Sequence, residues 1–474
     1  MDIRLFMIIL AQQTKQLCRD NRLWIMVAIL TTVVVASFAS TVTRQQQREA
    51  ERVVIAEADS AAWKRQGVVN PHTAAHFGHH LAKPFSSLSV FDHGILDYVG
   101  SLLRLEAHQQ SIASAVPVDE GTALNRFAGF SPAWALQVLA PLLVLIAGCS
   151  SFSGPLARNI LQQEMATSVS PTTLMLGRVG IFAVGILLFL GLLLALGVAV
   201  MALSGFAALE FSRLCWALAG YLLYLLVFAG VSLGVSANCQ TLRMSFVLVL
   251  GFWIGAVVVL PVVAPSAVAA VYPTPPAPLF QEEVESEINA GLDGEGPREQ
   301  RPERITELIL NKYGVDSIED LPVNFQGALL SFTEEESSRI YQEHFEALFG
   351  AFNEQKQLTR WFSAFTPLLA LKSWSSAWSE SDFAAQYRFL RDAERYRFAF
   401  VQRLNGDVGI NRQGNSRYET DVAALTADLD TFEFSAVSNE AIRELAWGDL
   451  MILAAWATMA CLFALASAKR LTRS

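Results

Sequence analysis

Long apolar runs separated by polar segments are the main pattern along this chain. A helix that crosses the hydrocarbon core of a bilayer, about 30 Å thick, needs roughly 20 apolar residues. Six runs meet this requirement: residues 23–42, 133–152, 179–203, 214–235, 245–264 and 450–468. The second run contains Gln137 and Pro141 but no charged residue. The pattern therefore predicts six transmembrane helices.

The basic residues of the short connections indicate the orientation of these helices. Lys and Arg stand in the N-terminal segment, in the connection with Arg158 and Arg178, beside Arg243, and in the C-terminal tail. The remaining short turn, 204–212, carries Glu210 and no basic residue. Because cytoplasmic connections are enriched in Lys and Arg, both termini are predicted to be cytoplasmic.

The first 22 residues allow two interpretations. Apolar residues at helical spacing over 3–17 predict an interfacial helix that precedes an uncleaved first membrane helix. The alternative is a signal peptide cleaved after Ser37-Phe38-Ala39, for which the leader is long. The uncleaved interpretation gives this organisation: interfacial helix 1–22, membrane helix 23–42, extracytoplasmic segment 43–132, membrane helices 2–5 within 133–264, extracytoplasmic segment 265–445, membrane helix 446–468, and cytoplasmic tail 469–474.

The two long polar segments read as mainly helical. Residues 334–360 and 382–404 each place aromatic and aliphatic side chains along one stripe, which predicts two amphipathic helices. A proline-rich stretch, 272–278, is typical of a stiff spacer, and residues 321–327 and 405–407 are typical of turns. The predicted fold class is an all-α integral membrane protein with six transmembrane helices and two large, mainly helical extracytoplasmic segments.

Composition narrows the possible functions. The chain is 53% hydrophobic and 17% charged with a net charge of −9, which argues against nucleic-acid binding. The five cysteines avoid the polar segments, so core packing must hold those segments together. No GxxxxGK[ST], HExxH or GxSxG motif occurs, so this chain is not expected to hydrolyse ATP through a phosphate loop, and any energy source must be another protein. Arg213 and Asp449 lie at predicted helix ends, where their side chains could reach water. No charged residue is predicted near the middle of the membrane, which counts against ion-coupled transport.

Histidines are concentrated in one place. Six of the seven lie in the segment 43–132, and His72 and His76 share one face of a predicted helix. Together with His79 or His80 they could supply three imidazoles to Zn²⁺ or Cu²⁺. The alternative is a polar helix–loop junction with hydrogen-bonded histidines and no metal.

The connection after the second membrane helix, residues 153–178, predicts a short helix and turn lying flat against the inner surface. A soluble partner could dock there, although a plain loop is the alternative. The candidate interface residues are Pro155, Leu156, Arg158, Ile160, Leu161, Glu164, Met165 and Ser168.

This connection begins with FSG at 152–154 and resembles the coupling segment of type-2 ABC transporter permeases. The polar segments resemble the branch of that family that carries a long extracytoplasmic domain of unknown function. The matching blocks are NPHTAAH at 70–76, LEAHQQ at 105–110, NRF at 125–127, YGV at 313–315, LPVNFQG at 321–327, PLLAL at 367–371 and VQRLNGD at 401–407.

The resemblance implies a permease subunit in a bacterial inner membrane, driven by separate ABC ATPase subunits that bind ATP and Mg²⁺. It implies a second permease chain and export of a peptide, lipid-like or other amphipathic substrate. Two alternatives stay open: a mechanical subunit that acts on a periplasmic partner without transport, and a membrane-bound metalloenzyme that uses the histidines. The stretch PLARNI at 155–160 departs from the charged family pattern, which leads to the hypothesis of a divergent half of a heterodimer.

Overall fold

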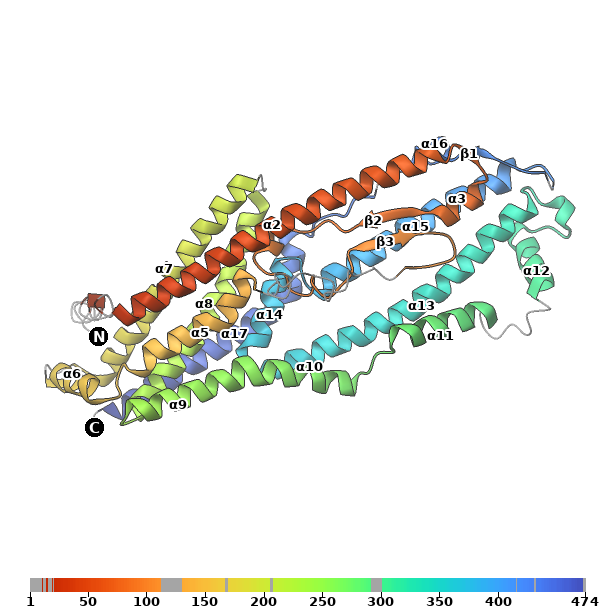
Figure 1. Ribbon diagram of the computed structural model, residues 1–474. Coiled ribbons are helices and arrows are strands. Elements are labelled where there is room, and N and C mark those ends of the chain that lie inside the picture. The colour runs from red at the N-terminus through yellow and green to blue at the C-terminus, as the bar shows by residue number, and fades with distance from the viewer. Residues whose placement is uncertain are drawn as a thin grey trace.

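The computed structural model describes residues 21–111, 130–166, 169–204, 208–290, 301–414, 416–429 and 432–471, together with residues 11, 14, 15 and 19. The molecule is elongated, with a bundle of apolar helices at one end and a long, mainly helical arm at the other (Figure 1). Ser168, most of the predicted interfacial helix 1–22 and the end of the predicted tail 469–474 lie outside the described residues.

The bundle confirms the prediction of six helices long and apolar enough to cross a membrane. They are α2 (Asn21–Arg65), α5 (Pro132–Cys149), α7 (Pro171–Ser204), α8 (Ala208–Asn238), a composite of α9 (Leu242–Trp253), a π-helical segment (Ile254–Val259) and α10 (Leu260–Val271), and α17 (Asn439–Ala468). Helix α8 lies at the centre and packs against α5, α7 and α17. The protein is therefore a helical membrane protein.

Three helix limits differ from the sequence prediction. Helix α2 runs on to Arg65 rather than ending at Val42, and α17 begins at Asn439 rather than near residue 450. Pro265, where the second extracytoplasmic segment is predicted to begin, lies inside α10, which continues to Val271. Apolar periodicity marks where a helix can meet lipid, and polar residues can extend the same helix beyond that point.

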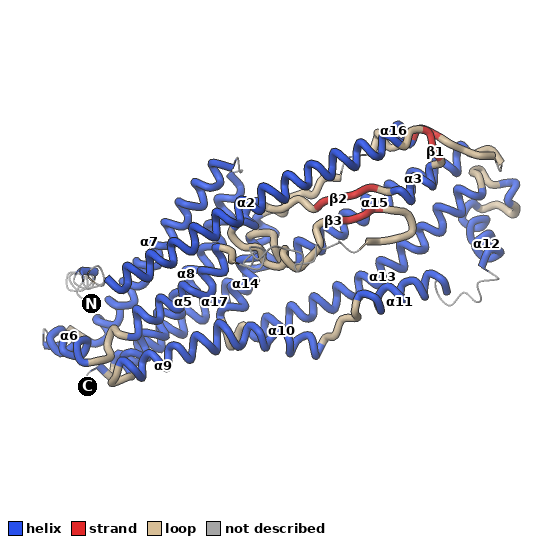
Figure 2. Tube along the Cα trace, in the orientation of Figure 1, coloured by secondary structure: helices blue, strands red, loops and turns tan. Residues whose placement is uncertain are grey.

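The arm is built from helices that flank two small two-stranded sheets. Its elements are β1 (Val68–Val69), α3 (Pro71–Phe77), β2 (His79–Ala82), β3 (Leu102–Leu105), α11 (Ala277–Ala290), α12 (Arg301–Tyr313), α13 (Phe325–Phe362), α15 (Phe383–Asn411), β4 (Thr420–Asp421) and α16 (Val422–Leu425). Strand β1 pairs with β4, and β2 pairs with β3, both antiparallel. Figure 2 shows these strands beside the long helices of the arm. The helices predicted at 334–360 and 382–404 are confirmed as parts of α13 and α15.

The turn predicted at residues 405–407 is wrong, because these residues lie inside α15. Asn405 is fully buried, and its amide nitrogen donates to the Leu330 carbonyl of α13. One turn further along, Gly409 lies against the backbone of Gly327. Contacts between the two helices outweigh the local preference of Asn and Gly for turns.

The arm is joined to the bundle by packing and by ion pairs. Helix α14 (Pro367–Trp378) packs against α8 and α17, and Trp374 and Trp378 are fully buried there. Arg213 of α8 pairs with Glu380 at 3.3 Å, and Asp449 of α17 pairs with Arg360 at 3.0 Å. Arg213 and Asp449 are both buried, so they contact the arm instead of reaching toward water.

Candidate functional site

Two of the candidate histidines lie on one face of α3. The helix begins with Pro71, and the side chain of Asn70 accepts hydrogen bonds from the backbone nitrogens of His72 and Thr73. This cap satisfies two of the amide groups that the first turn of a helix leaves without partners. His72 and His76 are four residues apart, and their ring centroids lie 4.7 Å apart.

The third histidine is His108, from the turn that follows β3. In the β2–β3 pair His79 is opposite Leu105, and a bridge between Glu106 and Gln109 closes the turn. His108 has a φ of 61°, which is costly for a residue with a side chain. Its backbone nitrogen donates to Glu334 Oε2 at 2.8 Å, and this bond helps to hold the conformation.

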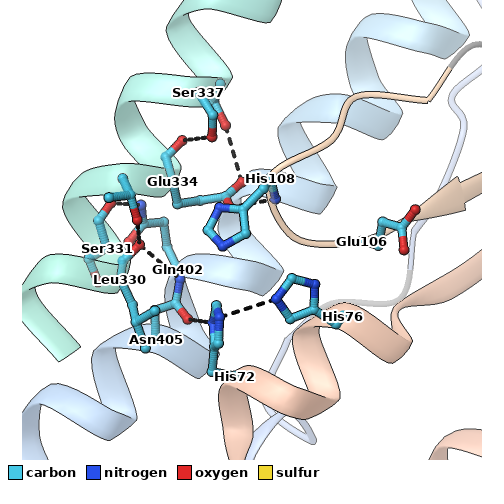
Figure 3. A network of polar contacts seen from close by, with 12 residues as sticks. His72, His76, Glu106, His108, Leu330, Ser331, Glu334, Ser337, Gln402 and Asn405 are labelled. Carbon is cyan, nitrogen blue, oxygen red and sulfur yellow. Dashed lines mark hydrogen bonds and ion pairs between the residues drawn. The ribbon is translucent and has the colours of Figure 1, made fainter. Parts of the chain in front are cut away.

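The three imidazoles converge on one point, as Figure 3 shows. One ring nitrogen from each of His72, His76 and His108 lies within 4.8 Å of the other two. The Nε2 atoms of His72 and His76 are 3.2 Å apart. The His76 ring is exposed, whereas His72 and His108 are half-buried, so the site is open on the His76 side.

Buried residues next to the cluster set which nitrogen carries the proton in two of the three rings, His72 and His108. Asn405 donates its amide to Leu330, so its oxygen is left to accept a proton from His72 Nδ1 at 3.0 Å. Similarly, Glu334 Oε2 lies 3.1 Å from His108 Nδ1. Both bonds assign the proton to Nδ1 and leave a lone pair on Nε2.

A buried charge network holds Glu334 in place. Its carboxylate lies 2.5 Å from Arg397, and both side chains are almost completely buried, at 0% and 1% exposed. Arg397 also pairs with Glu394 at 2.7 Å and donates to the Glu106 carbonyl. Burial raises the pKa of Glu334, but the hydrogen bonds from His108 and the charge of Arg397 outweigh it and lower this pKa to about 2.

The pKa values of two histidines are lowered. Burial lowers the pKa of His72, and the bond to Asn405 only partly opposes this effect. Burial and the nearby His108 lower the pKa of His76. Both rings are therefore neutral at pH 7, and the neutral imidazole is the form that binds metal ions.

The prediction that His79 or His80 completes the cluster is wrong. His79 Nδ1 lies 2.6 Å from Asp59 Oδ2, and the backbone nitrogen of His80 donates to the same carboxylate at 2.6 Å. Both residues lie on β2, which leaves α3 after Gly78, so their side chains pair with α2. His108 was among the clustered histidines, but only the β2–β3 pairing brings it to α3.

A second candidate site is the short helix α6 (Pro155–Ala166) between α5 and α7. It follows a turn in which Phe152 is buried, Ser153 Oγ donates to the Cys149 carbonyl, and Gly154 has a φ of 94°. Ser236 and Ser245, from α8 and α9, donate to that same carbonyl. The turn is therefore fixed to three helices, and glycine fits its left-handed conformation.

The sequence candidates lie on both faces of α6. Leu161 is buried and Met165 packs beside it, in a cluster with Leu174, Leu233 and Ala464 of the bundle. Glu164 lies 3.7 Å from Arg178. Pro155 and Leu156 are exposed, Leu156 by 75%, while Arg158 and Ile160 are half-buried. The exposed Asn159, Gln162 and Gln163 were missed because they are polar and carry no charge.

Comparison with known protein families found one match. The family described as "Domain of unknown function (DUF3526)" matches residues 279–450, from α11 to the first part of α17. Comparison with curated proteins and with solved structures gave no match. The matched region covers α13, α14 and α15, and thus the side chains of Glu334, Arg397 and Asn405 that support the histidine cluster.

Proposed function

We propose that this protein is the permease subunit of an ATP-driven transporter of the type-2 ABC class, in a bacterial inner membrane. The ATPase subunits, which bind ATP and Mg²⁺, dock on α6 at the cytoplasmic face. Two permease chains, identical or sibling, share the membrane, and the arm lies on the extracytoplasmic side. The exported substrate is a peptide, a lipid-like molecule or another amphipathic compound.

The observation that carries this proposal is the position of α6. It lies at the end of the bundle where α2 begins and α17 ends, opposite the arm (Figure 1). Leu161 anchors its inner face in the bundle, while Leu156 stays 75% exposed on the outer face. A helix held this firmly with an apolar residue exposed is suited to transmitting the movement of a docked protein to α5 and α7.

A second candidate function is mechanical, and α2 favours it. This helix has 45 residues, so at 1.5 Å per residue it is about 67 Å long, more than twice the bilayer core. It runs without a break from the bundle into the arm, where it contacts β2 and α16. Movement started at α6 could therefore reach a periplasmic partner of the arm without any molecule crossing the membrane.

The proposal is tested by purifying the tagged full-length chain from its native membrane in mild detergent. We expect an ABC ATPase to copurify and to hydrolyse ATP. Leu156→Asp should lower its yield at least about tenfold, because a carboxylate on the exposed face opposes an apolar contact. The matched control is Ile410→Asp, since Ile410 is 74% exposed and lies near the end of α15, a helix of the arm.

Two results would count against a permease subunit: no ATPase copurifies, or both variants lower its yield equally. Reconstitution of the complex in vesicles then separates the two candidate functions. ATP-dependent loss of a fluorescent lipid or peptide from the donor side supports transport. An active ATPase that moves none of these probes favours the mechanical role.

A further inference from the structure

We propose that His72, His76 and His108 bind one Zn²⁺ ion in the arm, with a fourth coordination position that the described residues leave for a water molecule or an outside donor atom. This inference goes beyond transport. The three histidines converge in the folded chain and would bind their ion whether or not the protein works as a permease.

The spacing of the nitrogens fits a small metal ion. Two nitrogen ligands of a tetrahedral Zn²⁺, at bond lengths of about 2.0–2.1 Å, lie about 3.3 Å apart. The Nε2 atoms of His72 and His76 are already 3.2 Å apart, and His108 brings its nitrogen within 4.8 Å. The nitrogen of His108 has to move closer to the other two to complete a triad of imidazoles on one side of the ion.

The surrounding residues are those that orient metal-binding histidines. A ligand histidine usually donates its other N–H to a carboxylate or carbonyl, which fixes the tautomer. Here Glu334 accepts from His108 Nδ1, and the Asn405 amide oxygen accepts from His72 Nδ1. Both acceptors are completely buried, and they come from α13 and α15, two different helices of the arm. The N–H pattern that a metal needs is thus set in advance for His72 and His108, whereas His76 has to release its Nε2 proton or change tautomer to bind the ion.

The donor set selects the kind of ion. Three imidazoles without a thiolate suit Zn²⁺ or Cu²⁺, whereas Mg²⁺ and Ca²⁺ prefer oxygen ligands. Zinc readily takes three protein ligands in a tetrahedral site and leaves one position open. Cu²⁺ prefers a square-planar or tetragonal site, and three rings converging from one side suit a tetrahedron better. Copper is therefore the rival ion in the test.

Bound zinc would join separate parts of the arm. It would cross-link α3 to the turn after β3, and through Asn405 and Glu334 to the α13–α15 pair. The carboxylates of Glu334 and Glu106 already have other partners: Glu334 pairs with Arg397, and Glu106 lies 3.0 Å from Arg104. A water molecule at the open position would be made more acidic by the ion.

The test measures the metal bound to the full-length protein purified in detergent. After chelation and dialysis, Zn²⁺ is titrated and counted by elemental analysis, and Co²⁺ is added separately as a spectroscopic probe. We expect one Zn²⁺ per chain, a tetrahedral Co²⁺ absorption spectrum, and a higher unfolding temperature with zinc. His76→Gln should weaken Zn²⁺ binding at least about 100-fold and abolish the cobalt spectrum, while Glu334→Gln should weaken it about 10- to 100-fold.

The matched control is His80→Gln, because His80 is also an exposed arm histidine but lies outside the triad, 3.5 Å from Asp59. It should bind zinc like the unmodified protein. The His76 ring is exposed, and among described residues its hydrogen bond is to His72 alone, so the metal-free variant should unfold at the unmodified temperature. Equal binding by the His76 variant, equal loss in the His80 variant, or a cobalt spectrum that is not tetrahedral would overturn the assignment.

Discussion

At the scale of single residues, buried partners set the orientation and protonation of the side chains around the histidine cluster. Glu334 shows this most clearly, because one carboxylate accepts from the His108 backbone and ring and also pairs with Arg397. A buried charge is stable only when paired in this way. The sequence placed Glu334 on an amphipathic helix, but its partners come from positions 108 and 397, and no local pattern links them.

The ionisation of Glu334 predicts an acid-sensitive arm. Its pKa falls from 4.5 to about 2 on folding, so the folded state binds this proton less readily than the unfolded chain. The stabilisation is complete above about pH 4.5 and is lost as the pH falls toward about 2. Unfolding temperatures measured from pH 6 to pH 2.5 should therefore decline steeply below pH 4.5. Glu334→Gln should lower the value at pH 6 and make the decline shallower, and an unchanged slope would contradict this role.

At the scale of elements, close backbone contact decides how α13 and α15 pack. A Cβ atom on Gly327 would lie 2.2 Å from the backbone nitrogen of Gly409, which is far inside van der Waals contact. The two helices were predictable from their apolar stripes, whereas the crossing point was not. The interaction lies between glycines 82 positions apart, so a pattern within one helix cannot reveal it.

This contact predicts opposite effects for two glycine substitutions in α13. Gly327→Ala should destabilise the arm by about 2 kcal/mol or more, because the methyl group meets backbone that cannot move aside. Gly350→Ala is the matched control, since a Cβ there meets nothing within 4 Å. It should stabilise the helix by about 0.5–1 kcal/mol through backbone entropy. Denaturant unfolding followed by tryptophan fluorescence measures both, and similar effects for the two variants would exclude close packing as the cause.

At the scale of the whole molecule, the bundle and the arm form one continuous object. Helix α2 passes from one to the other, α14 packs its tryptophans against the bundle, and the Arg213–Glu380 and Arg360–Asp449 pairs join the two parts. A conformational change at either end should therefore be transmitted to the other. The proposed role, which links a docked ATPase to the arm, requires such a coupling.

The proposed orientation predicts which end is reached from outside the cell. In a background in which all five cysteines are replaced, Arg395→Cys should react with a membrane-impermeant maleimide in intact spheroplasts. Leu156→Cys should react only after the membrane is opened. Both positions are highly exposed, at 70% and 75%, so access to the reagent and not burial decides the outcome. Labelling of Leu156→Cys in sealed spheroplasts would reverse the orientation.

By itself the sequence determined that the chain is a helical membrane protein with six apolar helices, and it predicted two helices of the arm. These features follow from the local cost of placing polar groups in lipid and from the period of a helix. It also placed His72 and His76 on one face of α3. Only the tertiary structure decided that His108, and not His79 or His80, joins them, and that residues 405–407 stay helical. Those outcomes depend on strand pairing and helix packing between distant segments, where tertiary contacts outweigh local preference.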